Sequence, residues 1–192
     1  FRPVNMYVGP DGALYIIDYY RQIIEHPEWM SEEAVNAGEL YNGSDRGRIY
    51  RISRTDAKPA DWMKGLQAGD AKDEALVEEL SGPNSWWRTN AQRLLVDRGN
   101  NQAVPMLIEK ATKDTSSMGR LHSLWTLEGM KELTAELIAQ ALRDPEPGIR
   151  ENAIKLAELH LTDAPELADV LLPLQTDPDA KVRFQLLCTL GF

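Results

Sequence analysis

The sequence has little of what metal and haem chemistry require. Its 192 residues include one cysteine, Cys188, and three histidines, His26, His122 and His160, which lie far apart along the chain. A single cysteine cannot close an internal disulfide, and it cannot supply a cysteine-based zinc site or a C-x-x-C-H haem attachment. The histidine spacing matches no metal-binding pattern. We therefore expect no metal and no cofactor in this chain.

Basic charge and long apolar runs are also scarce. The formal net charge is -9 and the isoelectric point is about 4.9, which argues against nucleic acid as a partner because phosphate binding needs clustered Lys and Arg. No apolar run approaches the roughly 18 residues of a membrane span, so we expect no direct membrane insertion. The chain begins with Phe1 and not with Met, and we interpret it as a fragment of a larger protein.

The first 54 residues have the pattern of strands and turns. Residues 6–18, MYVGPDGALYIID, alternate around Asp11-Gly12, which predicts a β-hairpin. Residues 47–54, GRIYRISR, predict a further strand. The long connection between the two predicts a short helix whose first turn Ser31 caps. Connections of this length are usually functional or disordered.

The second half of the chain has helical periodicity. Residues 55–72 are polar and contain Pro, Gly and Ala, so we interpret them as a linker. From residue 73 to 192 four similar blocks follow, each with an apolar helix and then a second helix with an arginine in register: Arg88, Arg120, Arg150 and Arg183. A period of 30–33 residues with two helices predicts an α-solenoid, because one helix pair cannot bury its apolar face alone.

An aspartate stands six residues before three of these arginines. An arginine in the first turn of a helix opposes the helix dipole, so it needs a carboxylate from its own or the adjacent inter-helix turn. We expect a structural ladder along the stack, formed by Arg88, Asp114, Arg120, Asp144, Arg150, Asp177 and Arg183. The D-x-x-x-x-x-R-x-x-A pattern, best seen in DPEPGIRENAIKLAEL, resembles HEAT repeats, especially the short kind of bilin-lyase-like proteins. That resemblance implies about four HEAT-like helix pairs in an ARM-type superhelix.

A cluster of polar side chains follows the hairpin. A functional interpretation makes His26 a general base or ligand, oriented by Asp18 or Glu25, with Tyr20 and Arg21 nearby. The alternative is that Asp18 ends a strand, the tyrosines pack and His26 lies in a surface loop. Sequence alone favours the second interpretation, because a catalytic set requires a spatial arrangement.

The segments FRPV, VGPDGALYIIDYYRQIIEH and RGRIYRI resemble the end of a β-propeller of the sorbosone/glucose-dehydrogenase type. There a G-P-D-G-x-L-Y turn joins two blade strands and a G-R-I-Y-R-I strand closes the last blade. More narrowly, the chain is similar to large secreted multidomain proteins of planctomycete-type and related bacteria, described as membrane-bound dehydrogenases. These carry a propeller, HEAT-like repeats and commonly a c-type haem domain. The resemblance implies a secreted or periplasmic parent that is a quinone-dependent sugar or alcohol oxidoreductase.

The resemblance places Asp18, Tyr20, Arg21 and His26 on the loop after a blade strand, where propeller loops line the central channel. One partial blade cannot assemble such a site, which is built from several blades. We therefore expect this chain to be a non-catalytic scaffold or protein-interaction module whose second helices face a protein partner or a neighbouring domain. The alternatives are a part of the oxidoreductase, with residues 18–28 in its active site, or a structural spacer between the propeller and a haem domain.

Overall fold

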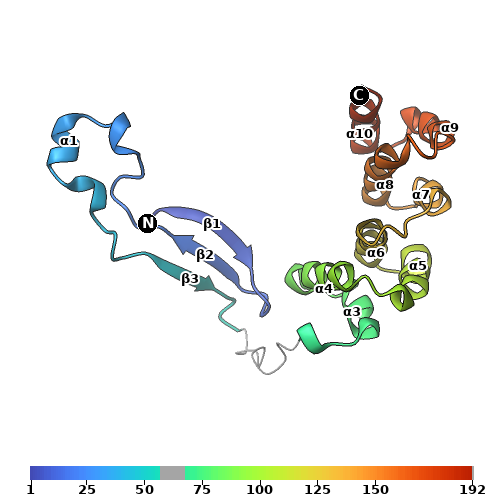
Figure 1. Cartoon of the computed structure of the whole chain (residues 1–192), viewed down its shortest axis with the longest axis horizontal. Coiled ribbons are helices and arrows are strands. Elements are labelled where there is room, and N and C mark those ends of the chain that lie inside the picture. Colours follow the sequence, from blue (N-terminus) through green and yellow to red (C-terminus); the bar gives the residue numbers. More distant parts are fainter. Residues whose placement is uncertain (57–67, 192) are drawn as a thin grey trace. The chain divides into compact units, whose positions relative to one another are not determined.

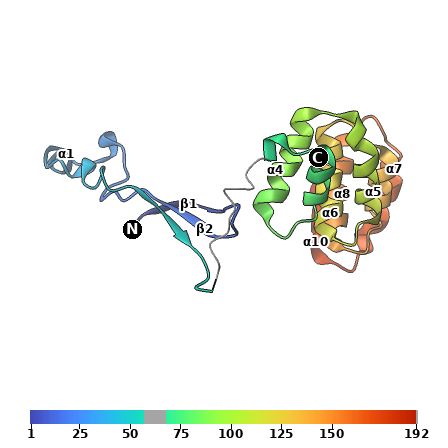
Figure 2. The same ribbon diagram turned by 90° about the horizontal axis from the view of Figure 1, so that it is seen from below.

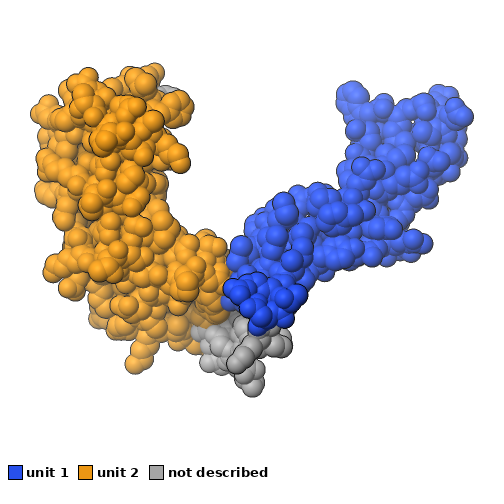
Figure 3. All heavy atoms as spheres, turned by 180° about the vertical axis from the view of Figure 1, so that it is seen from behind, with its two compact units in different colours: residues 1–66 blue, residues 67–192 orange. Residues whose placement is uncertain are grey.

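The chain forms two compact units. A computed structural model describes residues 1–56 and 68–191, and the units divide at residues 66 and 67. Figure 3 shows the two units in different colours. The first contains a small antiparallel sheet and the second is helical (Figure 1). The prediction of a mainly α chain with a small N-terminal β element is thus confirmed.

The sheet has three antiparallel strands. They are β1 (Pro3–Val8), β2 (Leu14–Asp18) and β3 (Arg48–Ile52), in the order β1-β2-β3. Val8 lies opposite Leu14, and Leu14 in turn lies opposite Ile52. The predicted hairpin and the predicted strand within residues 47–54 are both present, and the middle strand is the second half of the hairpin.

The turn of the hairpin is held by one carboxylate. Gly12 has a φ of 75°, a left-handed conformation that glycine adopts without strain. The Asp11 carboxylate accepts hydrogen bonds from Ala13 N at 3.1 Å, Tyr15 Oη at 3.2 Å and Arg51 Nε at 2.6 Å. Burial opposes ionisation of Asp11, but the bonds from Ala13 and Arg51 outweigh it, so the pKa of Asp11 is lowered. Asp11 therefore ties the turn to β3.

The connection from β2 to β3 is largely structured. It contains a 3-10 turn at Pro27–Trp29, the short helix α1 (Glu32–Asn36) and a second 3-10 turn at Glu39–Tyr41. Ser31 Oγ accepts a hydrogen bond from Ala34 N at 3.3 Å, so the predicted helix and its cap are confirmed.

The sheet leaves both of its faces open. Every residue of β1 and β3 is exposed, and in β2 only Ile16 and Asp18 are buried. The exposed side chains include Val4, Met6 and Ile49. Apolar side chains on both faces of a sheet are typical of strands that pack between other layers of a larger fold.

The helical unit consists of four pairs of helices in two layers. One layer contains α3 (Asp73–Glu79), α5 (Val104–Lys113), α7 (Ala135–Ala141) and α9 (Leu167–Leu171), which a 3-10 stretch extends to Thr176. The other layer contains α4 (Ser85–Arg98), α6 (Ser117–Gly129), α8 (Pro147–His160) and α10 (Ala180–Leu190). Within each layer neighbouring helices contact one another in chain order. Figure 1 shows the two layers side by side, and Figure 2 shows the array from below.

One apolar core runs through all four helix pairs. Its largest fully buried side chains are leucines and isoleucines of both layers, among them Leu107, Leu127, Ile138 and Ile154. The residue three positions after each arginine is buried in every pair: Ala91, Ser123, Ala153 and Leu186. Three of these four are small, so the same register position occupies little volume in the packed interior.

The end of the predicted linker lies against the helical unit. The linker was predicted at residues 55–72, of which 57–67 lie outside the described residues. Residues 68–70 form a 3-10 turn, and Arg98 at the end of α4 donates to Gly69 O and Ala71 O at 2.8 and 2.7 Å. Arg98 also pairs with Asp73 at 2.7 Å. The last residues of the predicted linker are therefore fastened to the first helix pair.

Two ion pairs of the predicted ladder form. Arg120 binds Asp144 through Nε and Nη2, both at 2.8 Å, and Arg150 binds Asp177 in the same way at 2.7 and 2.9 Å. Both arginine side chains and both carboxylates are largely buried. The hydrogen bond from Arg150 holds the pKa of Asp177 below its usual value. Each arginine thus reaches forward to the turn of the next pair.

The ladder differs from the prediction at its first rung, because Arg88 does not bind Asp114. Asp114 Oδ2 instead accepts hydrogen bonds from Lys110 Nζ at 2.8 Å and from Ser81 Oγ. Arg88 Nε points to His122 Nε2 at 3.3 Å, and His122 Nδ1 lies 2.7 Å from Gln92 Oε1. Burial and the charge of Arg88 lower the pKa of His122, so the neutral ring accepts from Arg88 and donates to Gln92.

Candidate functional site

Asp18 lies at the end of β2 and is almost completely buried. Its Oδ1 accepts hydrogen bonds from Arg2 N at 2.7 Å and Tyr20 N at 3.0 Å, while Oδ2 lies 3.9 Å from Arg48 Nε and has no hydrogen bond. These bonds fasten the chain before β1 and the chain after β2 to one carboxylate. The local role of Asp18 is therefore to end the strand, as the simpler sequence interpretation had it.

Tyr20 has a left-handed backbone. Its φ is 47°, which is uncommon for a residue with a side chain. Gly43 packs against it so closely that a Cβ at Gly43 would lie 2.3 Å from Tyr20 O. The Arg48 guanidinium lies 4.4 Å from the centroid of the Tyr20 ring, a cation–π distance. The turn after β2 is thus held from two sides.

Arg21 crosses from this turn to the far end of the connection. Its Nη1 donates to Leu40 O at 3.1 Å, and its guanidinium lies 5.5 and 5.7 Å from the rings of Tyr19 and Tyr41. Gln22 and Asn42 reinforce the crossing through two hydrogen bonds, at 3.2 and 2.9 Å. These contacts draw residues some twenty positions apart into one place.

His26 does not join the other candidates in a catalytic arrangement. The ring is exposed, and its Nδ1 accepts from Glu28 N at 3.4 Å, which caps the first 3-10 turn. Glu25 bonds the backbone N of His26 and not the ring. Within residues 1–56 the ring forms no hydrogen bond or ion pair with Asp18. The two carboxylates proposed to orient His26 therefore do not do so.

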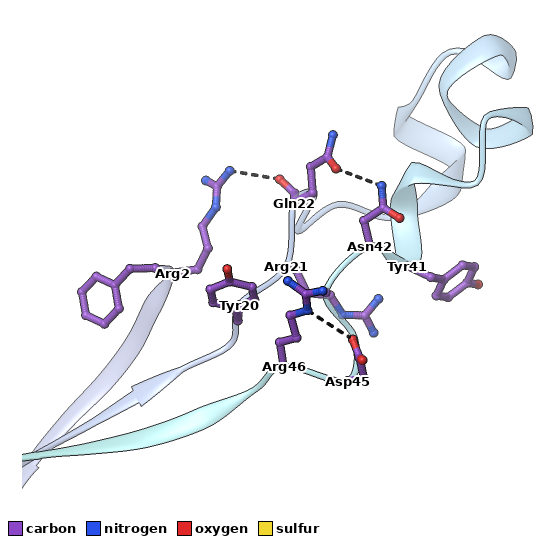
Figure 4. A pocket seen from close by; sticks show the side chains of 10 residues that line it. Arg2, Tyr20, Arg21, Gln22, Tyr41, Asn42, Asp45 and Arg46 are labelled. Atoms are coloured by element: carbon purple, nitrogen blue, oxygen red, sulfur yellow. Dashed lines mark hydrogen bonds and ion pairs between the residues drawn. The ribbon is translucent and has the colours of Figure 1, made fainter.

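An open cavity lies at the base of the connection. Its volume is about 660 Å³, and Figure 4 shows the side chains that line it, which come from three segments of the chain. Tyr20 and Arg21 line it, together with polar residues that the sequence did not single out: Arg2, Gln22, Asn42, Asp45 and Arg46. His26 and Arg21 line an adjacent cavity of about 610 Å³. Guanidinium and amide groups donate hydrogen bonds, so the first cavity suits a ligand rich in oxygen acceptors.

The signal for this cavity is weak in the sequence. Arg2 donates from Nη2 to Gln22 O at 3.0 Å, a contact across twenty residues that no local pattern encodes. Only the return of the connection to the sheet, at residues 41–46, brings the third side of the cavity into place. The only signal for the cavity in the sequence is that several arginines stand near the ends of the strands.

The described part of the chain holds no group of three or more His, Cys, Asp or Glu side chains that could bind a metal ion. Among residues 1–56 and 68–191 no helix is both long enough and apolar enough to cross a bilayer.

Comparison with known proteins adds one match. Residues 1–56 match the model of a family described as a domain of unknown function, DUF7133. No curated protein matches the chain. The matched range covers the three strands and the connection between β2 and β3, and it ends within the first structural unit, which extends to residue 66.

Proposed function

We propose that the helical unit is a HEAT-like α-solenoid that acts as a non-catalytic scaffold for a protein partner or a neighbouring domain. One repeated contact supports this best. In every pair the arginine donates from Nη1 to the carbonyl oxygen six residues earlier, at 2.6–2.8 Å: Arg88 to Gly82, Arg120 to Asp114, Arg150 to Asp144 and Arg183 to Asp177. A contact that recurs once per helix pair is typical of repeat arrays, whose usual role is to present an extended binding surface.

The layer of second helices offers such a surface. In each second helix, the residue two positions before the arginine and the residue five positions after it lie two turns apart on the same side of the helix. There and one turn further on lie Trp86, Arg93, Met118, Trp125, Lys155 and Leu159, which we name the second-helix stripe. Arg93, Met118 and Leu159 are exposed, and Trp86, Trp125 and Lys155 are partly buried. Trp, Met and Arg are enriched in protein interfaces, and Trp and Arg are among the residues that contribute most to their binding energy.

Two single substitutions on the second-helix stripe should each weaken partner binding. In a pull-down from the native host with the whole chain as bait, Arg93→Glu and Leu159→Glu should each reduce the recovered partner about tenfold, since single interface side chains commonly contribute that much. Both side chains are exposed, so folding should survive, which circular dichroism would verify.

Lys113→Glu is the matched control for these charge changes. Lys113 is equally exposed but lies on α5, in the other layer. Equal recovery by all three variants would show that the stripe is not the binding surface.

A second candidate function is supported by the cavity of the sheet unit. We propose that the loop of residues 18–28 contributes to ligand binding in a secreted, quinone-dependent sugar or alcohol oxidoreductase of which this chain is a part. Tyr20, Arg21 and Asn42 line an open cavity (Figure 4), and their side chains carry hydrogen-bond donors of the kind that a hydroxyl-rich or carboxylate ligand requires. The same donors suit a quinone that carries acidic groups. A c-type haem does not fit the residues present, because Cys188 is the sole cysteine.

In the intact parent protein, Arg21→Ala should raise the KM for the sugar or alcohol about tenfold, because a charged hydrogen bond to ligand is lost. Dye reduction in the presence of quinone measures this. Arg54→Ala is the control, since Arg54 pairs with Asp56 and does not line the cavity. Unchanged kinetics in both Arg21→Ala and His26→Ala would exclude the loop from the site.

A further inference from the structure

The last second helix, α10, presents an apolar side to solvent. Phe184, Leu187 and Leu190 are 67%, 70% and 54% exposed. The opposite side of α10, with Val182 and Leu186, is buried against the array. A terminal repeat that serves as a cap has a polar outer face, so α10 does not have the character of a cap.

The register of the repeats shows what these positions do elsewhere. Leu187 stands four residues after its arginine, as Leu124 and Ile154 do, and these two are 2% and 0% exposed. Leu190 stands seven residues after, as Leu127 and Ala157 do, and both of these are 0% exposed. The same two positions are therefore buried in α6 and α8 and open in α10.

Polar contacts identify which side of each helix faces forward. Glu128, one turn beyond Leu124 in α6, bonds His160 of α8 at 2.7 Å. Glu158, one turn beyond Ile154 in α8, bonds Thr189 of α10. Leu124 and Ile154 thus lie on the side toward the following helix, and Leu187 occupies that side of α10.

Arg183 repeats the pose of the ladder arginines but lacks their second partner. Its Nη1 donates to Asp177 O at 2.6 Å and Pro178 O at 3.1 Å, as Arg150 Nη1 does to Asp144 O and Pro145 O. In Arg150 the other edge, Nε and Nη2, grips the carboxylate of Asp177. Within residues 1–56 and 68–191 that edge of Arg183 has no carboxylate partner.

We propose that Arg183, Phe184, Leu187 and Leu190, the α10 face, bind one further helix pair of the same repeat type, with an aspartate in the turn between its helices. This rests on the proposed solenoid. The apolar positions select a helix pair, and the open guanidinium edge selects the carboxylate. A second copy of this chain stacked head to tail fits poorly, because Gly82 takes the place of that aspartate in its first pair.

The chain itself supplies a probe. A fusion in which residues 159–191 are repeated directly after Gly191 keeps the 33-residue period of the last two pairs. It places a second Asp177 at 27 residues after Arg183, the separation of Arg150 and Asp177. In this fusion we expect amide hydrogen exchange in α10 to slow roughly tenfold or more, since the helix changes from a terminal to an internal element.

Two variants of the fusion test the named contacts. Leu187→Glu in the original α10 should abolish the slowing, and Asp177→Asn in the appended copy alone should reduce it. Leu172→Glu is the control, because Leu172 is exposed but lies in the other layer. Unchanged exchange in α10 of the fusion would overturn the proposal, as would a dimer of the unfused chain that Leu187→Glu dissociates.

Exchange in α8 of the unfused chain separates this proposal from the solenoid on which it rests. If amides of α8 exchange slowly in the unfused chain, and exchange in α10 is the same with and without the fused repeat, the docking of a further pair is refuted and the array stands. An unprotected α8 would refute the array itself.

Discussion

Replacement of Ile154 by alanine should destabilise the helical unit by about 2–5 kcal/mol, the range for large-to-small changes in a packed core. Ile154 is fully buried in α8 and lies on the side toward α10. Shortening it removes apolar contacts and leaves a cavity that neighbouring helices cannot fill without moving. Urea unfolding followed by circular dichroism at 222 nm measures the change as a lower midpoint.

Leu187→Ala is the matched control, because Leu187 has the same position relative to its arginine but is mostly exposed. Its loss should change the free energy of unfolding by less than about 0.5 kcal/mol. The contrast between the two variants measures the burial that a following helix provides. A large loss in Leu187→Ala would mean that the α10 face is already covered in solution, and a small loss in Ile154→Ala would contradict the packing of α8 against α10.

Local patterns sufficed wherever a local interaction decides the structure. Asp11-Gly12 predicted the hairpin because a left-handed residue is needed there, and Ser31 predicted a helix because its oxygen caps the first turn. The arginine register predicted the four helix pairs, since each arginine bonds a carbonyl only six residues away.

Contacts between distant segments were harder to predict. The sequence pairs Arg88 with Asp114 as readily as Arg120 with Asp144, yet Lys110 takes Asp114 because it stands one helical turn before it. The i,i+4 spacing of Lys110 and Asp114 would have predicted this ion pair from the sequence.

The cavity of the sheet unit is a stronger case of this difficulty. Tyr20 and Arg21 were identified from their place after a strand, but Arg2 joins them through the pairing of β1 with β2, and Arg46 joins them through the return of the chain. Grouping by sequence proximity also placed His26 beside Asp18, and the fold sends the two to different contacts. Neighbouring positions on an irregular connection do not determine where side chains converge.

Removal of the arginine of a ladder rung should cost more than its hydrogen bonds alone. Arg150→Ala leaves the Asp177 carboxylate buried without its cation, and breaking a buried pair in this way costs about 3–5 kcal/mol. Because both side chains of this pair are slightly exposed, we expect a cost near the lower end of that range. Arg183→Ala is the control, because it loses the equivalent bonds to two carbonyl oxygens but no ion pair. Its cost should be about 1–2 kcal/mol.

Acid should reduce the difference in stability between Arg150→Ala and the unmodified chain. The pKa of Asp177 is lowered in the folded state, chiefly by the hydrogen bond from Arg150, so its contribution to stability is complete above the unfolded pKa of about 4. That contribution declines as the pH falls through the lowered folded value, whereas the variant has little of it to lose. The difference in urea midpoint between Arg150→Ala and the unmodified chain should therefore be smaller at pH 3 than at pH 7. The corresponding difference for Arg183→Ala should be the same at both pH values. A pH-independent deficit in Arg150→Ala would mean that the arginine acts through packing and its carbonyl bonds, and that the carboxylate of the next turn contributes nothing to holding the array together.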